Sequence, residues 1–157
     1  MKKVLYIIIV LFAIFAVSCN SNQVPVSPVS GEVIYNGKPV ENALISFVPQ
    51  SSNGRGASAQ TESNGSFVIL TQGATKNGAM TGKYKVLVSK LVEIDGNGNE
   101  VKRKFIEKID HANPNSQQEQ MYPQKNLLPE KYAKEETTEL IVNVEKKNNH
   151  FKLELKD

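Results

Sequence analysis

The chain has 157 residues, and its 19 Lys and Arg against 16 Asp and Glu give a formal net charge of +3 at pH 7. Two of those cations lie in the first three residues, and the near-balance of the remainder argues against a nucleic-acid partner. With no tryptophan and only five tyrosines, the chain offers little for a base-stacking or sugar-stacking platform, and its single cysteine excludes an intramolecular disulfide.

The N-terminus combines the three regions of a secretory signal peptide. Its first three residues, Met-Lys-Lys, carry positive charge, residues 4–17 form an unbroken apolar run, and small residues precede Cys19. A lone cysteine at this position resembles the signal of bacterial lipoproteins, a family in which that cysteine is acylated on sulfur and becomes the mature N-terminus. The sequence departs from the family pattern at Ala16, where leucine is usual.

This resemblance implies a lipoprotein signal peptide over residues 1–18 and acylation, for example with palmitate, at Cys19. It implies a bacterial protein that is exported and anchored to a membrane, at the outer membrane or cell surface or on the periplasmic face. Two or three acyl chains would hold the protein firmly, because each buried CH₂ contributes about 0.8 kcal/mol.

Two alternatives are open for the N-terminal segment. As an uncleaved anchor, the fourteen apolar residues 4–17 would span only about 21 Å as a helix, short of the ~30 Å hydrocarbon core of a bilayer. An ordinary signal peptide cut near Ser18 would instead leave a free thiol on a secreted protein. The position of the cysteine favours the lipoprotein interpretation.

Removal of residues 1–18 from the 157 leaves 139 residues, which is the size of one ordinary domain with its own core. Residues 19–28 are polar, contain two prolines and show no helical period. They are therefore predicted to be a lipidated tether between the membrane and the domain.

From Val29 onward, short alternating runs are separated by turn residues, among them Asn36-Gly37 and Ser63-Asn64-Gly65. The large side chains Phe67 and Tyr84 fall in the inward phase of their runs. Val86, Val88, Leu153 and Leu155 share that inward phase, whereas His150 falls in the outward phase. Without any long helical stretch, the pattern predicts an all-β fold, an antiparallel seven-stranded β-sandwich over residues 29–157. The predicted strands are Val29–Tyr35, Ala43–Val48, Ala57–Thr61, Phe67–Leu70, Lys83–Lys90, Leu140–Val144 and His150–Lys156.

Residues 91–128 interrupt this rhythm as a long, polar insertion. Its first part is expected to form a β-ribbon, with strands at Leu91–Ile94 and Val101–Ile106 joined by a loop at residues 95–99. The part over residues 111–124 is rich in Asn, Gln and Pro. Loops of this length tend to be functional or disordered, so the insertion is a candidate recognition surface.

Several short motifs resemble those of carboxypeptidase regulatory-like domains. Residues 31–43 resemble the opening "G-x-V…G-K-P-x-x-x-A" of that family, and residues 82–86 resemble its "G-x-Y-x-V" strand. Residues 61–67 resemble its "T-D-x-x-G-x-F" turn, with Glu62 where Asp is usual. The segment Pro129–Tyr132 and the last two strands resemble a subgroup of small bacterial envelope lipoproteins that carry this domain.

This resemblance implies a transthyretin-like sandwich of about seven strands and a non-catalytic adhesive or accessory module. The motifs are turn and core motifs, which specify a fold and say little about chemistry. The hydrolase branch of transthyretin-like proteins ends in Tyr-Arg-Gly-Ser, whereas this chain ends in Glu-Leu-Lys-Asp.

The search for a catalytic or metal site yields no assignment. His111 and His150 have no partner residues at metal-ligand spacing. Asp95 begins a calcium-loop pattern that fails at Glu100, where glycine is required, and at Ile106, where glutamate is required. We therefore expect no metal and no cofactor.

The sequence thus predicts a non-catalytic, lipid-anchored cell-envelope protein that presents a structural or adhesive β-sandwich, with Cys19 as its one assigned site residue. Its expected partners are the membrane, through the acyl chains, and an envelope protein or glycan. The alternative is a lipoprotein that binds glycans or small solutes, using loops at one end of the sandwich or the insertion over residues 91–128.

Overall fold

The computed structural model describes residues 23–101 and 122–157. Within these residues every named element is a β-strand except a single 3-10 turn, η2 (Glu130–Tyr132), so the all-β prediction is confirmed. No helix in the described part of the chain is long and apolar enough to cross a membrane. The predicted signal peptide, Cys19 and His111 lie outside the described residues.

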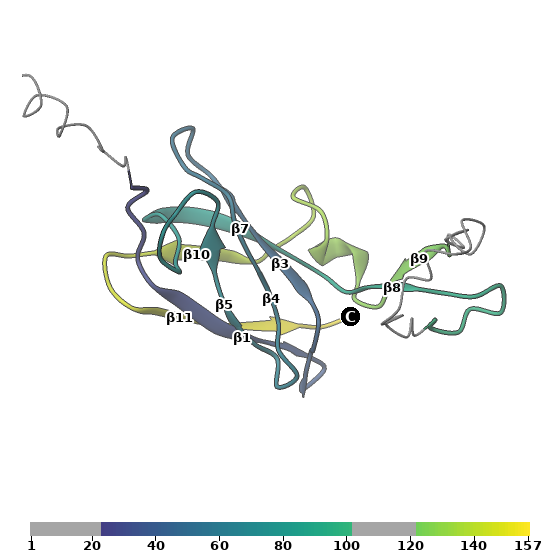
Figure 1. Ribbon diagram of the computed structural model, residues 1–157. Helices are drawn as coiled ribbons and strands as arrows, with labels where there is room; N and C mark the ends of the chain where they lie inside the picture. The colour runs from purple at the N-terminus through teal and green to yellow at the C-terminus, as the bar shows by residue number, and fades with distance from the viewer. Residues whose placement is uncertain (1–22, 102–121) are drawn as a thin grey trace, which may run out of the picture.

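Two sheets face each other across a common core, and we call them together the two-sheet domain (Figure 1). The four-stranded sheet is made of β11 (Asn149–Leu155), β1 (Val29–Tyr35), β2 (Lys38–Pro39) and β5 (Ser66–Val68). The five-stranded sheet has the order β10 (Ile141–Val144), β7 (Gly82–Ser89), β3 (Leu44–Pro49), β4 (Ala57–Gln60) and β6 (Leu70–Thr71).

The first and last strands of the domain pair in parallel, from Val29 opposite Asn149 to Tyr35 opposite Leu155. This differs from the expected fully antiparallel arrangement; the other named strand pairs of the described chain are antiparallel. A two-residue hairpin forces antiparallel pairing on the strands that it joins. No such turn links β1 to β11, because the whole domain lies between them.

The seven predicted strands agree in position with the structure to within one or two residues, but the two sheets contain nine strands, because β2 is not among those predicted and one predicted run is divided. The run Phe67–Leu70 is two strands, because the chain crosses from one sheet to the other at Ile69. Ile69 is fully buried between Val68 and Leu70, which are about half exposed. The crossing therefore drives one apolar side chain into the space between the sheets.

The core is formed by the inward side chains of both sheets, in the alternating phase that the sequence predicts. Tyr84, Val86 and Val88 of β7 are each at most 1% exposed, and Leu153 and Leu155 of β11 at most 3%. Aromatic rings connect the layers, since Phe47 of β3 lies 5.6 Å from Tyr84 and 6.3 Å from Phe151 of the opposite sheet, between ring centroids. 

The β1–β2 turn shows how local sequence positions the strands. Asn36 and Gly37 both have positive φ angles, 48° and 78°, as a two-residue hairpin turn requires. Asparagine and glycine are the residues that adopt this backbone conformation at least cost.

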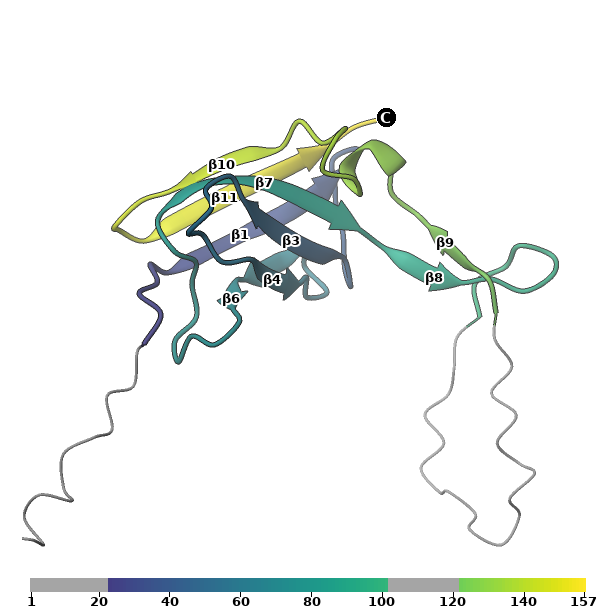
Figure 2. The same cartoon turned by 90° about the horizontal axis from the view of Figure 1, so that it is seen from above.

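A third, two-stranded sheet extends beyond β7 as an arm, formed by β8 (Leu91–Glu93) and β9 (Gln124–Asn126) (Figure 2). The predicted strand at residues 91–94 is thus present, but its main partner is β9. Of the expected partner strand only Val101 is described, and its backbone N–H donates to the Glu93 carbonyl.

The base of the arm is joined to the two-sheet domain. The side-chain oxygen of Asn126 accepts hydrogen bonds from the backbone N–H groups of Lys90 and Leu128, at 3.0 and 3.2 Å. Leu128 itself is only 5% exposed and belongs to the core. The end of the insertion is therefore part of the packing of the domain.

Phe67 provides a test of the core. It is 2% exposed, so Phe67→Ala should lower the free energy of unfolding by about 3–5 kcal/mol in urea denaturation, through lost burial and a residual cavity. The neighbouring Val68 is 53% exposed, and Val68→Ala serves as the control with little expected change. A loss below about 1 kcal/mol for Phe67→Ala would contradict its place in the core.

Candidate functional site

The chain enters the two-sheet domain at one end, which we call the tether end. There Ser27 pairs with Ala79, with backbone hydrogen bonds of 2.8 and 3.0 Å in the two directions. The same end carries the β3–β4 loop (residues 50–56), the β6–β7 segment (72–81) and the β10–β11 turn (145–148). The arm lies at the opposite end (Figure 2).

A buried asparagine holds the tether end together. The side-chain amide of Asn149 donates to the carbonyls of Lys147, Glu145 and Pro28 at 2.7, 3.1 and 3.2 Å, and its oxygen accepts the Glu145 N–H at 3.0 Å. Asn149 is 7% exposed. One side chain therefore connects the β10–β11 turn to Pro28, the residue directly before β1.

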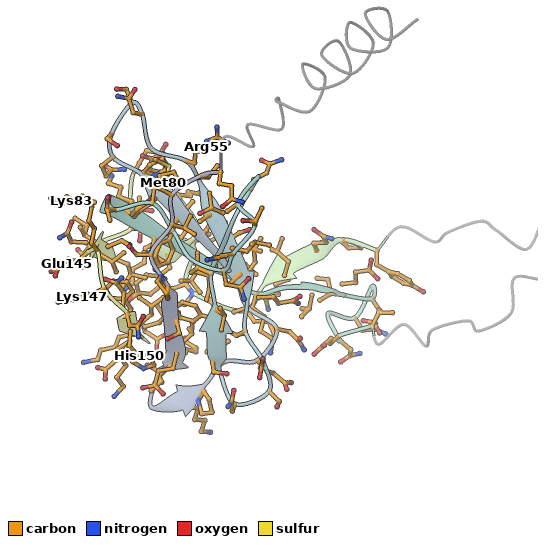
Figure 3. The ribbon with its side chains drawn as sticks, turned by 60° about the vertical axis from the view of Figure 1, so that its left-hand side comes forward. Arg55, Met80, Lys83, Glu145, Lys147 and His150 are labelled. Carbon is orange, nitrogen blue, oxygen red and sulfur yellow. The ribbon has the colours of Figure 1, made fainter. Side chains whose placement is uncertain are left out.

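The surface of the tether end is rich in cations, and Figure 3 shows several of them on the side that faces the viewer. Its exposed cationic side chains are those of Arg55, Lys76, Lys83, Lys146 and Lys147. Two carboxylates accompany them. Glu135 accepts a hydrogen bond from the side chain of Gln50 in the β3–β4 loop at 3.4 Å, and Glu145 forms an ion pair of 2.7 Å with the Lys147 ammonium group, with both side chains more than half exposed. An exposed pair of this kind contributes roughly 0–1 kcal/mol.

The opposite end has a different electrostatic character. Its carboxylates include those of Glu41, Glu62, Glu93, Asp95, Glu100 and Asp157. The carboxylate of Asp157 accepts hydrogen bonds from the Tyr35 hydroxyl and the Asn36 side-chain amide. These bonds hold the pKa of Asp157 below its usual range, and the bond to Asp157 raises the pKa of Tyr35.

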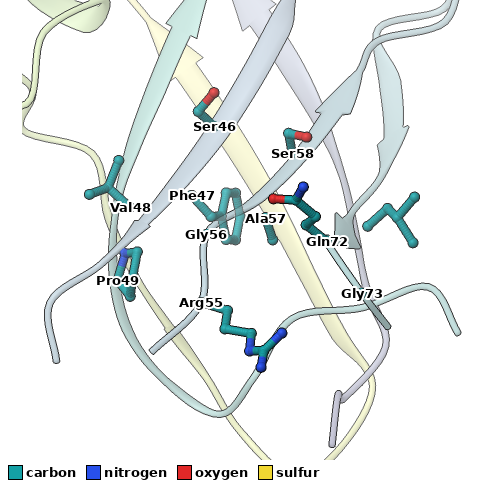
Figure 4. A pocket seen from close by; sticks show the side chains of 11 residues that line it. Ser46, Phe47, Val48, Pro49, Arg55, Gly56, Ala57, Ser58, Gln72 and Gly73 are labelled. Atoms are coloured by element: carbon teal, nitrogen blue, oxygen red, sulfur yellow. The ribbon is translucent and has the colours of Figure 1, made fainter. Parts of the chain in front are cut away.

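A shallow groove of about 800 Å³ runs along the outer face of the five-stranded sheet, over β3, β4 and β6 (Figure 4). Ser46 and Ser58 are paired neighbours on its floor, Leu70 lies beside Ser58, and Gln72 and Arg55 extend the polar lining. The hydroxyl, amide and guanidinium groups provide hydrogen-bond donors for a polar or anionic ligand.

No aromatic face lines this groove. Phe47 is among its lining residues, but its side chain is 1% exposed and packs in the core. Stacking on a sugar ring is therefore not a mode of binding that this groove offers.

The histidine that the structure describes lies on the outer face of the four-stranded sheet, as the alternation predicts. His150 is exposed, and its Nδ1 lies 3.2 Å from the Ser30 hydroxyl. A serine–histidine pair needs a third group to orient the base and donors for an oxyanion, and no such groups are recorded beside this pair among the described residues.

In the loop at residues 95–99, the carboxylate of Asp95 accepts hydrogen bonds from other residues of the same loop. Asp95 accepts hydrogen bonds from the backbone N–H groups of Asn97 and Asn99, at 2.8 and 2.9 Å, and from the Asn99 side chain. The bond from the Asn99 backbone is the main cause that lowers the pKa of Asp95. Residues 23–101 and 122–157 contain no group of three or more candidate metal ligands.

Comparison with known proteins identifies no family. No family model matches the chain, and no curated protein matches it. Among solved structures, a 9R-lipoxygenase from Cyanothece PCC8801 is similar with a TM-score of 0.38 and 16% identity. The alignment covers 96% of this chain and 20% of the lipoxygenase chain, so the chain spans about a fifth of that protein.

Neither the groove nor the cationic tether end was assigned from the sequence. The cations come from four separate segments, and no local spacing indicates that they meet. For the groove, alternation does place Ser46 and Ser58 on outward faces, but the strand order that makes them neighbours is not a local property.

Asn149 gives a test of the tether end. Asn149→Ala removes the donor to three carbonyls and the acceptor for the Glu145 N–H, which should lower the free energy of unfolding by about 1–3 kcal/mol. The matched control is Asn148→Ala at the exposed neighbouring position, expected to change it by less than about 0.5 kcal/mol. Equal effects of the two substitutions in urea unfolding would contradict the role of Asn149.

Proposed function

We propose that this protein is a bacterial lipoprotein of the cell envelope, anchored through acylated Cys19, whose single β-sandwich is a non-catalytic structural or adhesive module. The observation that carries the proposal is the lone cysteine directly after the charged start and apolar run of the N-terminus. Its partners are the membrane and an envelope protein or glycan.

The short length of chain between Cys19 and the first residue bonded to the domain is consistent with a lipid anchor at Cys19. Ser27, which is hydrogen-bonded to Ala79, lies eight positions after Cys19 in the chain. Fully extended, this segment reaches about 28 Å. The segment is long enough to leave the domain clear of the acyl chains and short enough to keep it at the membrane surface.

The second part of the proposal is that the domain is a transthyretin-like sandwich of the carboxypeptidase regulatory-like kind. Support comes from the packing of the motif residues. Gly31 of the "G-x-V" motif lies opposite Phe67 of the turn motif, and a Cβ at Gly31 would approach the Phe67 Cζ to 2.6 Å and the Phe151 carbonyl oxygen to 2.1 Å. The glycine is therefore needed for the ring to cover β1.

The remaining motifs also have structural roles that suit a fold-defining set. Tyr84 of the "G-x-Y-x-V" strand is 1% exposed and packs against Phe47, and its hydroxyl donates to the Met80 carbonyl at 3.0 Å. The hydroxyl of Tyr132 donates to the Lys156 carbonyl and accepts its N–H, which fixes the end of β11. Such residues hold a scaffold in place and leave its surface to do the binding.

Metabolic labelling tests the anchor. In cells fed a fatty-acid analogue, the wild-type protein should acquire the label and fractionate with membranes, whereas Cys19→Ser should acquire none. Cysteine is the acylated residue in the proposed modification, and the chain contains no other. Labelling of both proteins, or of neither, would contradict the proposal.

The groove of the five-stranded sheet favours a second candidate function, a lipoprotein that binds a glycan or small polar solute. Its support is the adjacent hydroxyls of Ser46 and Ser58, together with Gln72 and Arg55, along one open surface. These groups match the hydroxyl and carboxylate groups of polar solutes through hydrogen bonds alone.

A glycan array followed by titration calorimetry tests this second function. If the groove binds a glycan, Gln72→Ala should weaken binding by about tenfold, the effect of losing a hydrogen bond or two to the ligand. Gln60→Ala is the matched control, because Gln60 is exposed on the same sheet and outside the groove. Absence of any array signal, or equal loss in both variants, would exclude the groove as the site.

A further inference from the structure

The exposed charges of the domain are distributed unequally between its two ends. The tether end carries five cationic side chains and two carboxylates, one of which is paired with Lys147. At the opposite end, lysines such as Lys38 and Lys90 are mixed with a larger number of carboxylates, among them those described above. The chain is close to neutral as a whole, so the positive surface of the tether end results from this arrangement.

The structure places these cations beside the entry of the tether. The Ser27–Ala79 pair joins the tether to the segment that carries Lys76, and the Asn149 side chain joins Pro28 to the turn that carries Lys146 and Lys147. Arg55 and Lys83 lie on the same end of the domain (Figure 3). The point of attachment and these cations therefore lie at the same end of the domain.

We infer that the tether end is a docking surface for the anionic phospholipid headgroups of the membrane that holds the acyl chains, an inference that rests on the proposed anchor at Cys19. Two properties indicate that the ligand of this surface is the membrane: the length of the tether and the charge of the tether end. The tether confines this end to within about 28 Å of the bilayer surface, and cations near an anionic leaflet are attracted to it.

Docking in this way orients the molecule. The membrane attracts the tether end and repels the carboxylates of the opposite end. The arm of β8 and β9 then points away from the bilayer, where a partner in the envelope can approach it. Residues 102–104, a basic cluster in the sequence, follow Val101 in the chain and lie outside the described residues.

Vesicle sedimentation tests the surface without the lipid anchor. The protein used is the chain from residue 19 onward with Cys19→Ser, which retains the whole described fold and carries no acyl chain. It should co-sediment with phosphatidylcholine vesicles that contain about a third phosphatidylglycerol, and not with pure phosphatidylcholine. Binding should weaken strongly between about 0.1 M and 1 M salt, because the Debye length falls from about 10 to 3 Å.

Two matched variants locate the interaction. The tether-end variant combines Lys76→Gln, Lys83→Gln, Lys146→Gln and Lys147→Gln, and should bind anionic vesicles at least about tenfold more weakly. The opposite-end variant combines Lys38→Gln, Lys90→Gln, Lys125→Gln and Lys156→Gln, removes the same charge, and should bind as the unsubstituted chain does. Circular dichroism and the urea midpoint of each variant establish that both remain folded.

Each other outcome overturns the inference. An equal loss of vesicle binding in the two variants would mean that binding depends only on the net charge of the protein. Equal binding to neutral and anionic vesicles would mean that binding does not depend on headgroup charge. Tighter binding to a soluble polyanion such as heparin would assign the surface to a polymer. The anchor is judged separately by the labelling of Cys19: an acylated protein whose unacylated form binds no vesicles overturns only the docking surface, and vesicle binding without acylation overturns only the anchor.

Discussion

The pairing of the first strand with the last is the constraint on which the rest of the structure depends. β1 is bonded to β11 along its whole length and also pairs with β2 and β5, so every strand of the four-stranded sheet is organised around it. Gly31 in its middle allows the Phe67 ring to lie over the strand. The aromatic contact between Phe151 and Phe47 then places this sheet against the other. Because β1 immediately follows the tether, the same pairing determines where the tether meets the domain.

This closure gives the molecule two chemically distinct ends. Strands that run the length of the domain bring their connecting segments together at one end or the other, and the lysine-bearing segments happen to meet where the chain enters. Asn149, the first residue of β11, is important in this arrangement. Its side-chain amide forms hydrogen bonds with Glu145 and Lys147 of the β10–β11 turn and with Pro28, the residue directly before β1. A buried polar group of this kind must have its hydrogen bonds satisfied, and no buried side-chain polar atom in the described residues lacks a partner.

The family-like motifs and the surface have separate roles. Gly31, Phe67, Tyr84 and Tyr132 all support packing or hold a strand end, so the residues that suggest a family explain the scaffold. The groove over β3, β4 and β6, the cationic tether end and the arm are made of other residues. The proposed structural or adhesive function depends on these surfaces, because they are where the protein would contact the membrane or a partner. The scaffold determines how the surfaces are spaced and oriented.

Local sequence determined the strands, their inward faces and their turns. Alternation at a period of two residues identified Tyr84, Val86, Val88, Leu153 and Leu155 as buried, and Asn36-Gly37 indicated a turn with positive φ angles. Cys19 was likewise assigned from its neighbours in the sequence alone. Only the tertiary structure decided the parallel β1–β11 pair, the crossing between sheets at Ile69, the choice of β9 as the partner of β8, and the meeting of Arg55, Lys83 and Lys147 at one end. The physical reason is that turn conformation and side-chain phase depend on residues a few positions apart, whereas strand partners and surface clusters depend on how distant segments close around one core.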